Sequence, residues 1–219
     1  MKKIVITTLL LMLMALPSYA IDKTGLFGIG VNGALSLPAS GDLTADSSLS
    51  DFFDAGPRFG LFVNYTPTSA MTVQAGFNYG FMKIKDEANM TVDMEPHFVT
   101  PEVYLSGKFN LGSFIKSETN FLNPYLSAGP SLVFWKFTDD GAGGDPLVVD
   151  NEEFKKTSFG LNFGAGVEGM IARNISVFFE GRYLMIFSED EEKFGPDFGN
   201  LSTIDLNIGL SYYFPFSSN

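Results

Sequence analysis

The stretch IDLNIGLSYYF, residues 204–214, decides the fold of this chain. Its apolar side chains occupy every second position, and small or polar residues fill most of the positions between them. This period of two is typical of a β-strand whose two faces meet different surroundings, because a helix would repeat its apolar positions roughly every 3.6 residues. The stretch therefore predicts a strand from Ile204 to Phe214.

The same alternation recurs along the rest of the chain. Clear copies occupy residues 59–65, 73–81 and 159–167, and weaker copies occupy residues 27–37, 99–109, 126–134 and 175–187. Several of these segments have the roughly 9–11 residues that a tilted strand needs to cross a bilayer. The chain is therefore predicted to be all-β, with about eight strands.

A leader segment precedes the first predicted strand. Two lysines give it a basic start, residues 4–16 are almost wholly apolar, and small residues lead up to Ala20. This order is typical of a secretory signal peptide that is cleaved after Ala20. The alternative, a membrane-spanning helix, needs about 20 apolar residues, more than this run provides. We therefore predict a signal peptide at residues 1–20 and one barrel domain at residues 21–219.

The composition excludes several classes of protein. Without the leader, the chain has 12 basic and 25 acidic residues, a net charge of −13. Nucleic acid is therefore not an expected partner, because phosphate binding needs a basic surface. The absence of cysteine removes disulfides, thiol catalysis and thiolate metal sites. No later apolar run is long enough for a helical span, so a membrane location requires a closed barrel.

The connections between the predicted strands alternate in length. Residues 38–54, 84–96, 138–156 and 188–200 form long connections, whereas residues 67–70 and 172–174 form short ones. This alternation is expected for an outer-membrane barrel with long outer loops and short periplasmic turns. Residues 110–120 are long where a short turn is expected. Pro101 and Pro130 fall inside predicted strands, where each removes a ladder donor, so we expect a bulge or other irregularity there.

The polar faces of the strands indicate which side points inward. They carry mainly small and hydroxyl residues and only seven charged ones, namely Arg58, Glu102, Lys108, Glu168, Glu180, Arg182 and Asp205. A soluble, lipocalin-like barrel would turn this face to water, yet soluble surfaces are about a quarter to a third charged. The pattern therefore favours a closed antiparallel transmembrane β-barrel whose apolar face meets lipid.

The seven charges predict a closed lumen. An eight-stranded barrel is just wide enough for its own side chains to fill. Each interior charge then needs a partner, because an unpaired buried charge is costly. We expect Glu180 and Arg182 to join Glu168 in one network, and we expect no diffusion pore.

Three short motifs carry a resemblance to a known family. Residues 123–129 read NPYLSAG, residues 179–183 read FEGRY, and residues 209–214 read GLSYYF. Together with the signal peptide, they resemble the small outer-membrane β-barrels of the OmpA/OmpX-like superfamily. The resemblance implies a porin-like barrel in the outer membrane of a Gram-negative cell envelope, in contact with lipid and lipopolysaccharide. It also implies that barrel-assembly machinery reads the C-terminal strand, although residues 215–219 here follow the usual terminal aromatic.

The sequence offers no complete catalytic centre. His97 is the one histidine, and no serine follows it before Ser106. Some small outer-membrane barrels are lipid A deacylases that place a histidine and a serine close together, and a hydrolase needs nucleophile, base and orienting acid within hydrogen-bond reach. We therefore predict no enzyme, no catalytic residue, no cofactor and no assigned metal ligand.

Acidic residues concentrate in the four long connections. These connections hold 19 of the 25 acids and four lysines, a net charge of −15. Residues 139–141 resemble the start of a calcium loop, but Gly141 and Gly143 stand where ligands are needed, which argues against an EF-hand. Divalent cations at these loops are one hypothesis, and plain ionic screening of a solvated rim is the other.

Three functions remain open at the level of the sequence. The first is a structural or surface-interaction role for an outer-membrane barrel with a closed or very narrow lumen. The second is a small pore or a conduit for hydrophobic ligands, and the third is a lipid A-modifying enzyme. Fold alone does not decide among them.

Overall fold

The computed structural model describes residues 23–44, 47–86, 95–114, 122–149, 152–196 and 198–214. The predicted signal peptide at residues 1–20 and the C-terminal residues 215–219 lie outside these ranges. None of the helices in the described ranges is long and apolar enough to cross a membrane.

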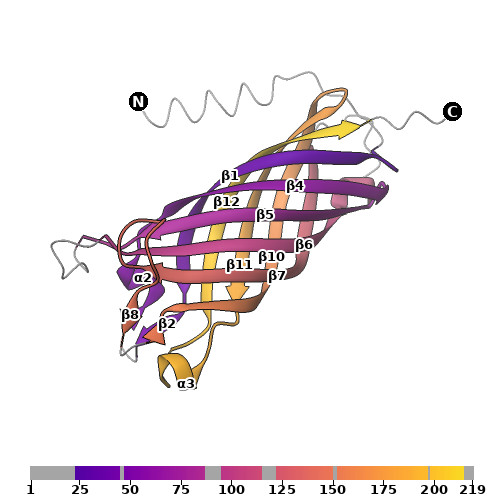
Figure 1. Cartoon of the computed structure of the whole chain (residues 1–219). Helices are drawn as coiled ribbons and strands as arrows, with labels where there is room; N and C mark the ends of the chain where they lie inside the picture. The colour runs from indigo at the N-terminus through magenta and orange to yellow at the C-terminus, as the bar shows by residue number, and fades with distance from the viewer. Residues whose placement is uncertain are drawn as a thin grey trace.

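Eight long strands form one closed antiparallel barrel (Figure 1). The strands are β1 (Phe27–Ser40), β4 (Gly56–Thr68), β5 (Met71–Lys83), β6 (His97–Asn110), β7 (Leu122–Thr138), β10 (Lys155–Ala172), β11 (Ile175–Ile186) and β12 (Leu201–Phe214). Each strand pairs with its neighbours in the chain, and β1 closes the sheet by pairing with both β4 and β12. Phe27 therefore lies opposite Phe214, and the sheet has no open edge.

The predicted fold class and the eight predicted strands are confirmed. Several strands extend beyond their predicted ends, most clearly β7, which the alternation assigns to residues 126–134. Pro38 is predicted in a loop but belongs to β1, where the register with β12 shifts between Pro38 and Ser40. The connection after β6 begins with the 3-10 helix η1 (Leu111–Phe114), and most of the rest of it lies outside the described residues.

The irregularity expected at Pro101 and Pro130 takes another form. Neither proline causes a register shift, and both lie in continuous pairings on one side, with β5 and β10 respectively. The β6–β7 pairing is interrupted near each of them, although its register is the same before and after. Proline has no N–H to donate, so each one weakens this seam without bending the strand out of register.

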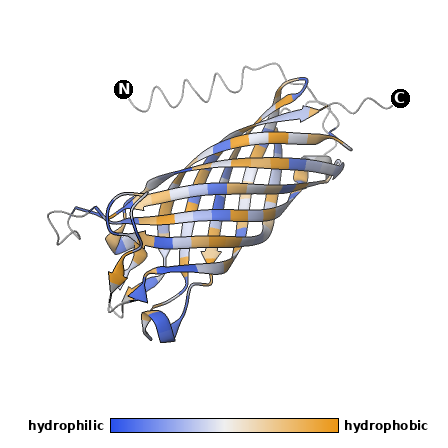
Figure 2. Cartoon of the chain, in the orientation of Figure 1, coloured by the Kyte–Doolittle hydropathy of each residue, from blue (hydrophilic) through white to orange (hydrophobic). Residues whose placement is uncertain are grey.

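Many outward side chains are apolar and many inward ones are polar, as expected, and the hydropathy alternates along the strands (Figure 2). The outward row of β12, for example, exposes Ile204, Leu206 and Ile208, whereas the inward Asp205 and Asn207 between them are buried. Outward rings pair near both ends of the barrel. Phe27 stacks on Tyr65 at 4.6 Å between ring centroids, and Phe159 stacks on Phe187 at 5.9 Å. Apolar walls with aromatic rings near both ends are typical of membrane barrels.

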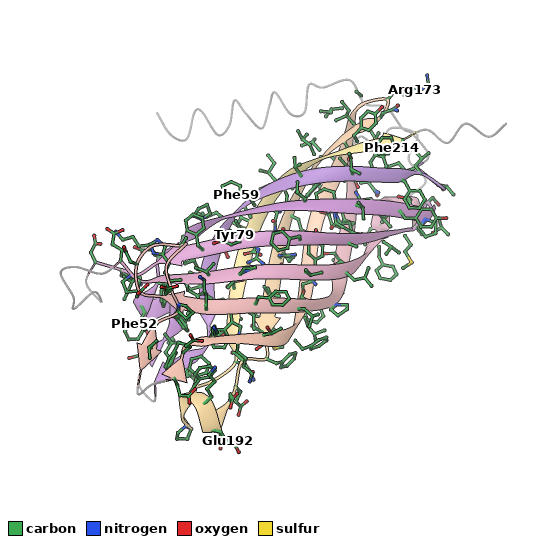
Figure 3. The ribbon with its side chains drawn as sticks, viewed as in Figure 1. Phe52, Phe59, Tyr79, Arg173, Glu192 and Phe214 are labelled. Carbon is green, nitrogen blue, oxygen red and sulfur yellow. The ribbon has the colours of Figure 1, made fainter. Side chains whose placement is uncertain are left out.

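The two ends of the barrel are built differently. The turn end has tight connections such as the one at Arg173, and the loop end carries the four long connections with Phe52 and Glu192 (Figure 3). The loop end also contains the short elements β2 (Asp42–Thr44), β3 (Ser47–Ser48), α2 (Leu49–Phe52), β8 (Val148–Val149), β9 (Glu152–Glu153) and α3 (Glu191–Phe194).

The long connections are tied to one another. Phe53 bridges to Ile84 between the first and second connections, and Glu95 bridges to Asp140 between the second and third. The Lys156 ammonium contacts the Asp190 carboxylate at 3.1 Å, which joins the third and fourth. The described parts of the four connections are therefore linked to one another.

Candidate functional site

Four charged side chains form a closed ring of ion pairs in the middle of the lumen. The Arg58 guanidinium contacts Glu102 at 2.5 Å and Asp205 at 3.5 Å. The Arg182 guanidinium contacts the same two carboxylates at 2.8 and 3.1 Å. These four residues, which we call the charge quartet, come from β4, β6, β11 and β12, so the ring reaches across the barrel.

Polar neighbours complete the surroundings of the charge quartet. The Ser131 hydroxyl and the Asn78 amide donate to Glu102 at 2.7 and 2.9 Å, and the Ser36 hydroxyl donates to Asp205 at 2.6 Å. Burying charges is costly, and close ion pairs with additional hydrogen bonds offset that cost. The quartet is therefore a fixed structural element that occupies the central lumen.

The other interior acids lie apart from the charge quartet. Glu180 accepts a hydrogen bond from the Ser127 hydroxyl at 3.1 Å. Glu168 contacts Lys23 at 2.8 Å and accepts a hydrogen bond from the Tyr213 hydroxyl at 3.0 Å, near the turn end. The expected single network of Glu168, Glu180 and Arg182 is therefore not formed. The register explains this, because Glu180 and Arg182 lie opposite Gly166 and Gly164 of β10 rather than opposite Glu168.

Lys23 is a site residue that the alternation did not predict. It precedes β1, and the chain turns at Gly25, whose positive φ of 77° suits glycine. The Gly25 N–H donates to the Thr66 carbonyl at 2.7 Å, which fixes this turn against the end of β4. Residues outside a strand have no inward or outward parity, so the period of two carried no signal for Lys23.

Lys108 also departs from expectation. It is buried in the lumen, but its ammonium lies over the Phe178 ring, 4.6 Å from the centroid, and 4.8 Å from that of Tyr125. Each interior charge was expected to have a partner. Its direct contacts are aromatic faces, which attract cations through their quadrupoles, and Glu180 and Glu168 attract it electrostatically from farther away.

Apolar side chains fill the lumen at the loop end. The buried members of this group, which we call the apolar plug, are Leu49, Phe53, Met82, Phe98, Val133, Trp135, Phe137, Leu184, Ile186, Phe198 and Leu201. Trp135 stacks on Phe198 at 5.7 Å, and its indole N–H donates to the Ser158 hydroxyl at 3.0 Å. The long connections supply Leu49, Phe53 and Phe198, so the loops fold inward and close this end.

His97 is the first residue of β6, at the loop end. Its Nδ1 lies 2.7 Å from the Glu95 carbonyl oxygen, and its own carbonyl accepts a hydrogen bond from the Thr138 hydroxyl at 3.2 Å. The described contacts of His97 include no serine hydroxyl. This geometry positions the ring but does not assemble a nucleophile, a base and an acid.

Three of the acidic loop residues have local partners that change their pKa. Hydrogen bonds from the Ser48 backbone N–H and hydroxyl lower the pKa of Asp51, and a hydrogen bond from Lys156 lowers the pKa of Asp190. Lys155 lowers the pKa of Glu153 in the same way. Among the residues that the structure describes, no group of three or more acidic or histidine side chains could hold a metal ion.

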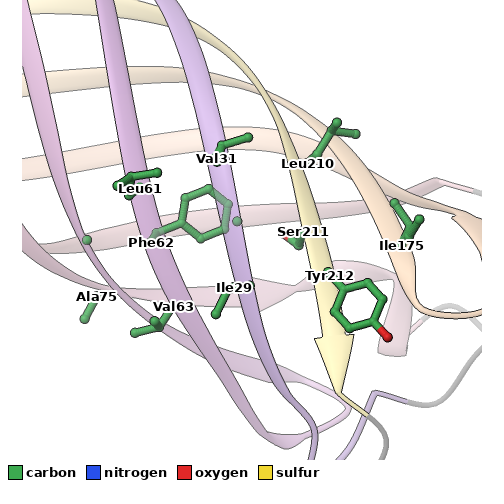
Figure 4. Close-up of a pocket in the computed structure, with 12 residues that line it drawn as sticks. Ile29, Val31, Leu61, Phe62, Val63, Ala75, Ile175, Leu210, Ser211 and Tyr212 are labelled. Atoms are coloured by element: carbon green, nitrogen blue, oxygen red, sulfur yellow. The ribbon is translucent and has the colours of Figure 1, made fainter.

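An apolar groove of about 710 Å³ lies on the lipid-facing wall (Figure 4). Outward side chains such as Ile29, Val63, Leu210 and Tyr212 line it, and Ala75 leaves space between larger neighbours. The groove is open to the surroundings of the barrel and does not reach the charge quartet. In a bilayer, such a surface meets acyl chains.

A closed antiparallel barrel with an apolar outer wall is typical of integral outer-membrane β-barrels. Residues 6–214 match the family described as "Outer membrane protein beta-barrel domain". The chain belongs to this family and is an outer-membrane protein. No match to a curated protein was found.

Solved structures share the fold. Neisserial surface protein A superimposes with a TM-score of 0.56 at 15% identity, covering 86% of this chain and 97% of that chain. A major outer membrane protein from Thermus thermophilus gives 0.54 at 12% identity, covering 87% and 99%. Ail of Yersinia pestis, in complex with the heparin analogue sucrose octasulfate, gives 0.51 at 15% identity, covering 87% and 99%. At these identities the likeness concerns the fold alone.

Proposed function

We propose that this protein is a closed outer-membrane barrel with a structural and surface-interaction role. The observation that carries the proposal is the filled lumen, in which the apolar plug and the charge quartet occupy successive levels. An eight-stranded barrel leaves little space beyond its own side chains. Partners would then contact the outer surface of the protein.

The long loops are proposed to face the cell exterior, with residues 1–20 removed on export. Epitope tags inserted in the four loops should be accessible to antibody on intact cells. Tags at Thr68 or Arg173, at the turn end, should become accessible only after lysis. Exposure of the turn-end tags on intact cells would reverse the orientation, and an N-terminus other than Ile21 would refute the cleavage site.

Divalent cations are the proposed partners of the acidic loops. The loops carry a net charge of −15, so their carboxylates repel one another. Carboxylates in extracellular modules bind Ca²⁺ with dissociation constants of roughly 10⁻⁴–10⁻³ M. Such ions would also bridge the loops to the phosphates of neighbouring lipopolysaccharide. Calorimetry with CaCl₂ against NaCl of equal ionic strength should give a saturable heat for Ca²⁺ alone. Absence of that heat, with identical melting in both salts, would leave only ionic screening.

The charge of the loops also argues against one ligand class. Ail was solved with a polysulfated heparin analogue. The loops of the present chain carry 19 acids and four lysines, so a polysulfate would meet like charge. We therefore propose that this chain does not bind heparin-like ligands at physiological salt, and retention on a heparin column would contradict this.

The alternatives have distinct readouts. A small pore would conduct ions, and a hydrophobic-ligand conduit would raise uptake of an apolar dye into cells. A lipid A-modifying enzyme would change the mass of lipid A on expression, and a His97→Ala variant would abolish that change. We propose that none of these effects occurs. Assembly is proposed to depend on the C-terminal strand β12, which ends at Phe214.

A further inference from the structure

Lys108 is a deeply buried cation in the lumen. Lys108 is 4% exposed and projects inward from β6. No carboxylate of the described residues lies within ion-pair distance of its ammonium. Glu180 and Glu168 attract this ammonium from beyond ion-pair distance. Burial of a charge is costly, so the groups in direct contact with it must also contribute stabilisation.

Three aromatic rings surround the Lys108 ammonium. The centroids of Phe178, Tyr125 and Phe62 lie 4.6, 4.8 and 5.9 Å from Nζ. The rings come from β11, β7 and β4, and Phe62 meets Phe178 edge to face at 5.7 Å. Since β4 and β11 are not neighbours in the barrel, these two rings meet across the lumen.

Glycines on the paired strands leave the space that these rings occupy. Phe62 lies opposite Gly30, Phe178 opposite Gly209, and Tyr125 opposite Gly166. A Cβ atom at any of these glycines would overlap the ring of its partner. The ring of Phe62 accordingly lies across toward the strand that carries Ile29 and Val31 (Figure 4). The arrangement is therefore built into the register of three strand pairs.

We propose that Phe62, Tyr125 and Phe178 form a cation site that spans the lumen, with the Lys108 ammonium as its resident occupant. The site takes a primary alkylammonium, because three ring faces offer negative potential around a buried ammonium. It lies on the turn side of the charge quartet, as the order of Arg58 and Phe62 along β4 indicates. It closes the barrel at a second level, by cation–π contacts rather than ion pairs. The site does not depend on the proposed role of the loops.

Truncation of Lys108 provides the test. Lys108→Ala removes a propylammonium group and leaves the rings, so the variant should melt about 5 °C lower than the natural protein. Refolding the variant from urea with n-propylammonium chloride should restore most of that loss, whereas n-propanol of the same shape should not. Lys136→Ala, on the outward face of β7, is the matched control and should respond to neither additive. Equal recovery with propanol, or no recovery with either additive, would overturn the proposal.

A second pair of variants covers the case in which Lys108→Ala does not fold. Lys108→Arg keeps the cation and should fold and melt close to the natural protein. Lys108→Met keeps the length without the charge and should melt several degrees lower. If Lys108→Met melts as high as Lys108→Arg, the charge is not part of the site. Glu180→Gln tests the competing explanation, in which Glu180 stabilises the Lys108 ammonium from a distance. If that explanation holds, Lys108→Arg and Lys108→Met should melt at the same temperature in the Glu180→Gln background. If the cation site holds, the arginine variant should still melt higher there.

Discussion

At the residue scale, the interior charges are stabilised in two ways. Glu102 and Asp205 each contact both arginines of the charge quartet, and the Ser131 and Ser36 hydroxyls donate to their remaining oxygens. Lys108 instead contacts aromatic rings. A change at either place removes a partner from a buried charge.

Glu102→Gln tests the charge quartet. The substitution leaves Arg58 and Arg182 buried with one carboxylate between them, so the free energy of unfolding should fall by about 3–5 kcal/mol. Urea unfolding in detergent micelles, followed by tryptophan fluorescence of Trp135, measures this. Glu192→Gln makes the same chemical change on the exposed tip of α3 and should alter the free energy by less than about 0.5 kcal/mol. Equal effects of the two variants would contradict the assigned role of the quartet.

Asp51 tests the local order of the first long loop. Its carboxylate accepts hydrogen bonds from the backbone N–H and the hydroxyl of Ser48, both at 2.8 Å, and these lower its pKa below 3.8. A lowered pKa in the folded state means that the contribution is present above pH 3.8 and is lost as pH falls through the folded pKa. The NMR signal of the Ser48 amide should therefore shift with a midpoint below pH 3.8, and Asp51→Asn should abolish the shift. A midpoint at or above 3.8 would show that the contact does not persist in solution.

At the scale of strands, inward glycines determine where large rings fit. Gly30 and Gly209 lie directly opposite Phe62 and Phe178, and each ring occupies the space that a side chain on the glycine would need. The alternation of small and large residues thus fills the lumen level by level. Glycine content on the inward face is a packing requirement here.

Gly30→Ala tests this packing. Its methyl group would overlap the Phe62 ring and approach the Leu210 carbonyl, and overpacking of this kind costs about 1–3 kcal/mol. Gly181→Ala is the matched control, because nothing lies within 4 Å of an added Cβ at that strand position. The two variants share the same change in the unfolded chain, so their difference in unfolding free energy isolates the overlap. No difference between them would contradict the packing argument.

The period of two predicted the eight strands but not how their side chains meet. Alternation assigns a side chain to a face, so it predicts that Arg58, Glu102, Arg182 and Asp205 share one side of the sheet. Which of them touch depends on register and on stagger around the barrel, and neither is encoded locally. For that reason the prediction that Glu168, Glu180 and Arg182 form one network was wrong.

The alternation of apolar and polar residues could not predict two further features. Lys23 acts from outside any strand, where parity has no meaning. The apolar plug depends on α2 and on the residues after α3, because Leu49, Phe53 and Phe198 fold back into the barrel from segments that the pattern assigned to loops. Apolar residues within acidic loops were the available signal for this inward folding.

At the scale of the whole molecule, the lumen is occupied at successive levels from one end to the other. The apolar plug lies at the loop end, the charge quartet in the middle, the Lys108 rings beyond it, and Lys23 with Glu168 at the turn end. Apolar packing, ion pairs and cation–π contacts all contribute to filling the lumen. This filling supports the proposal that the barrel does not conduct.

Current recording in planar lipid bilayers tests this claim most directly. Purified protein, shown to be folded by its heat-dependent mobility in gels, should insert and give no stable current steps in concentrated KCl. Detergent without protein serves as the baseline, and an open porin added to the same bilayer shows that steps are detectable. A flat record with inserted protein is the predicted result. Stable, large, uniform current steps from the folded protein would contradict the closed lumen.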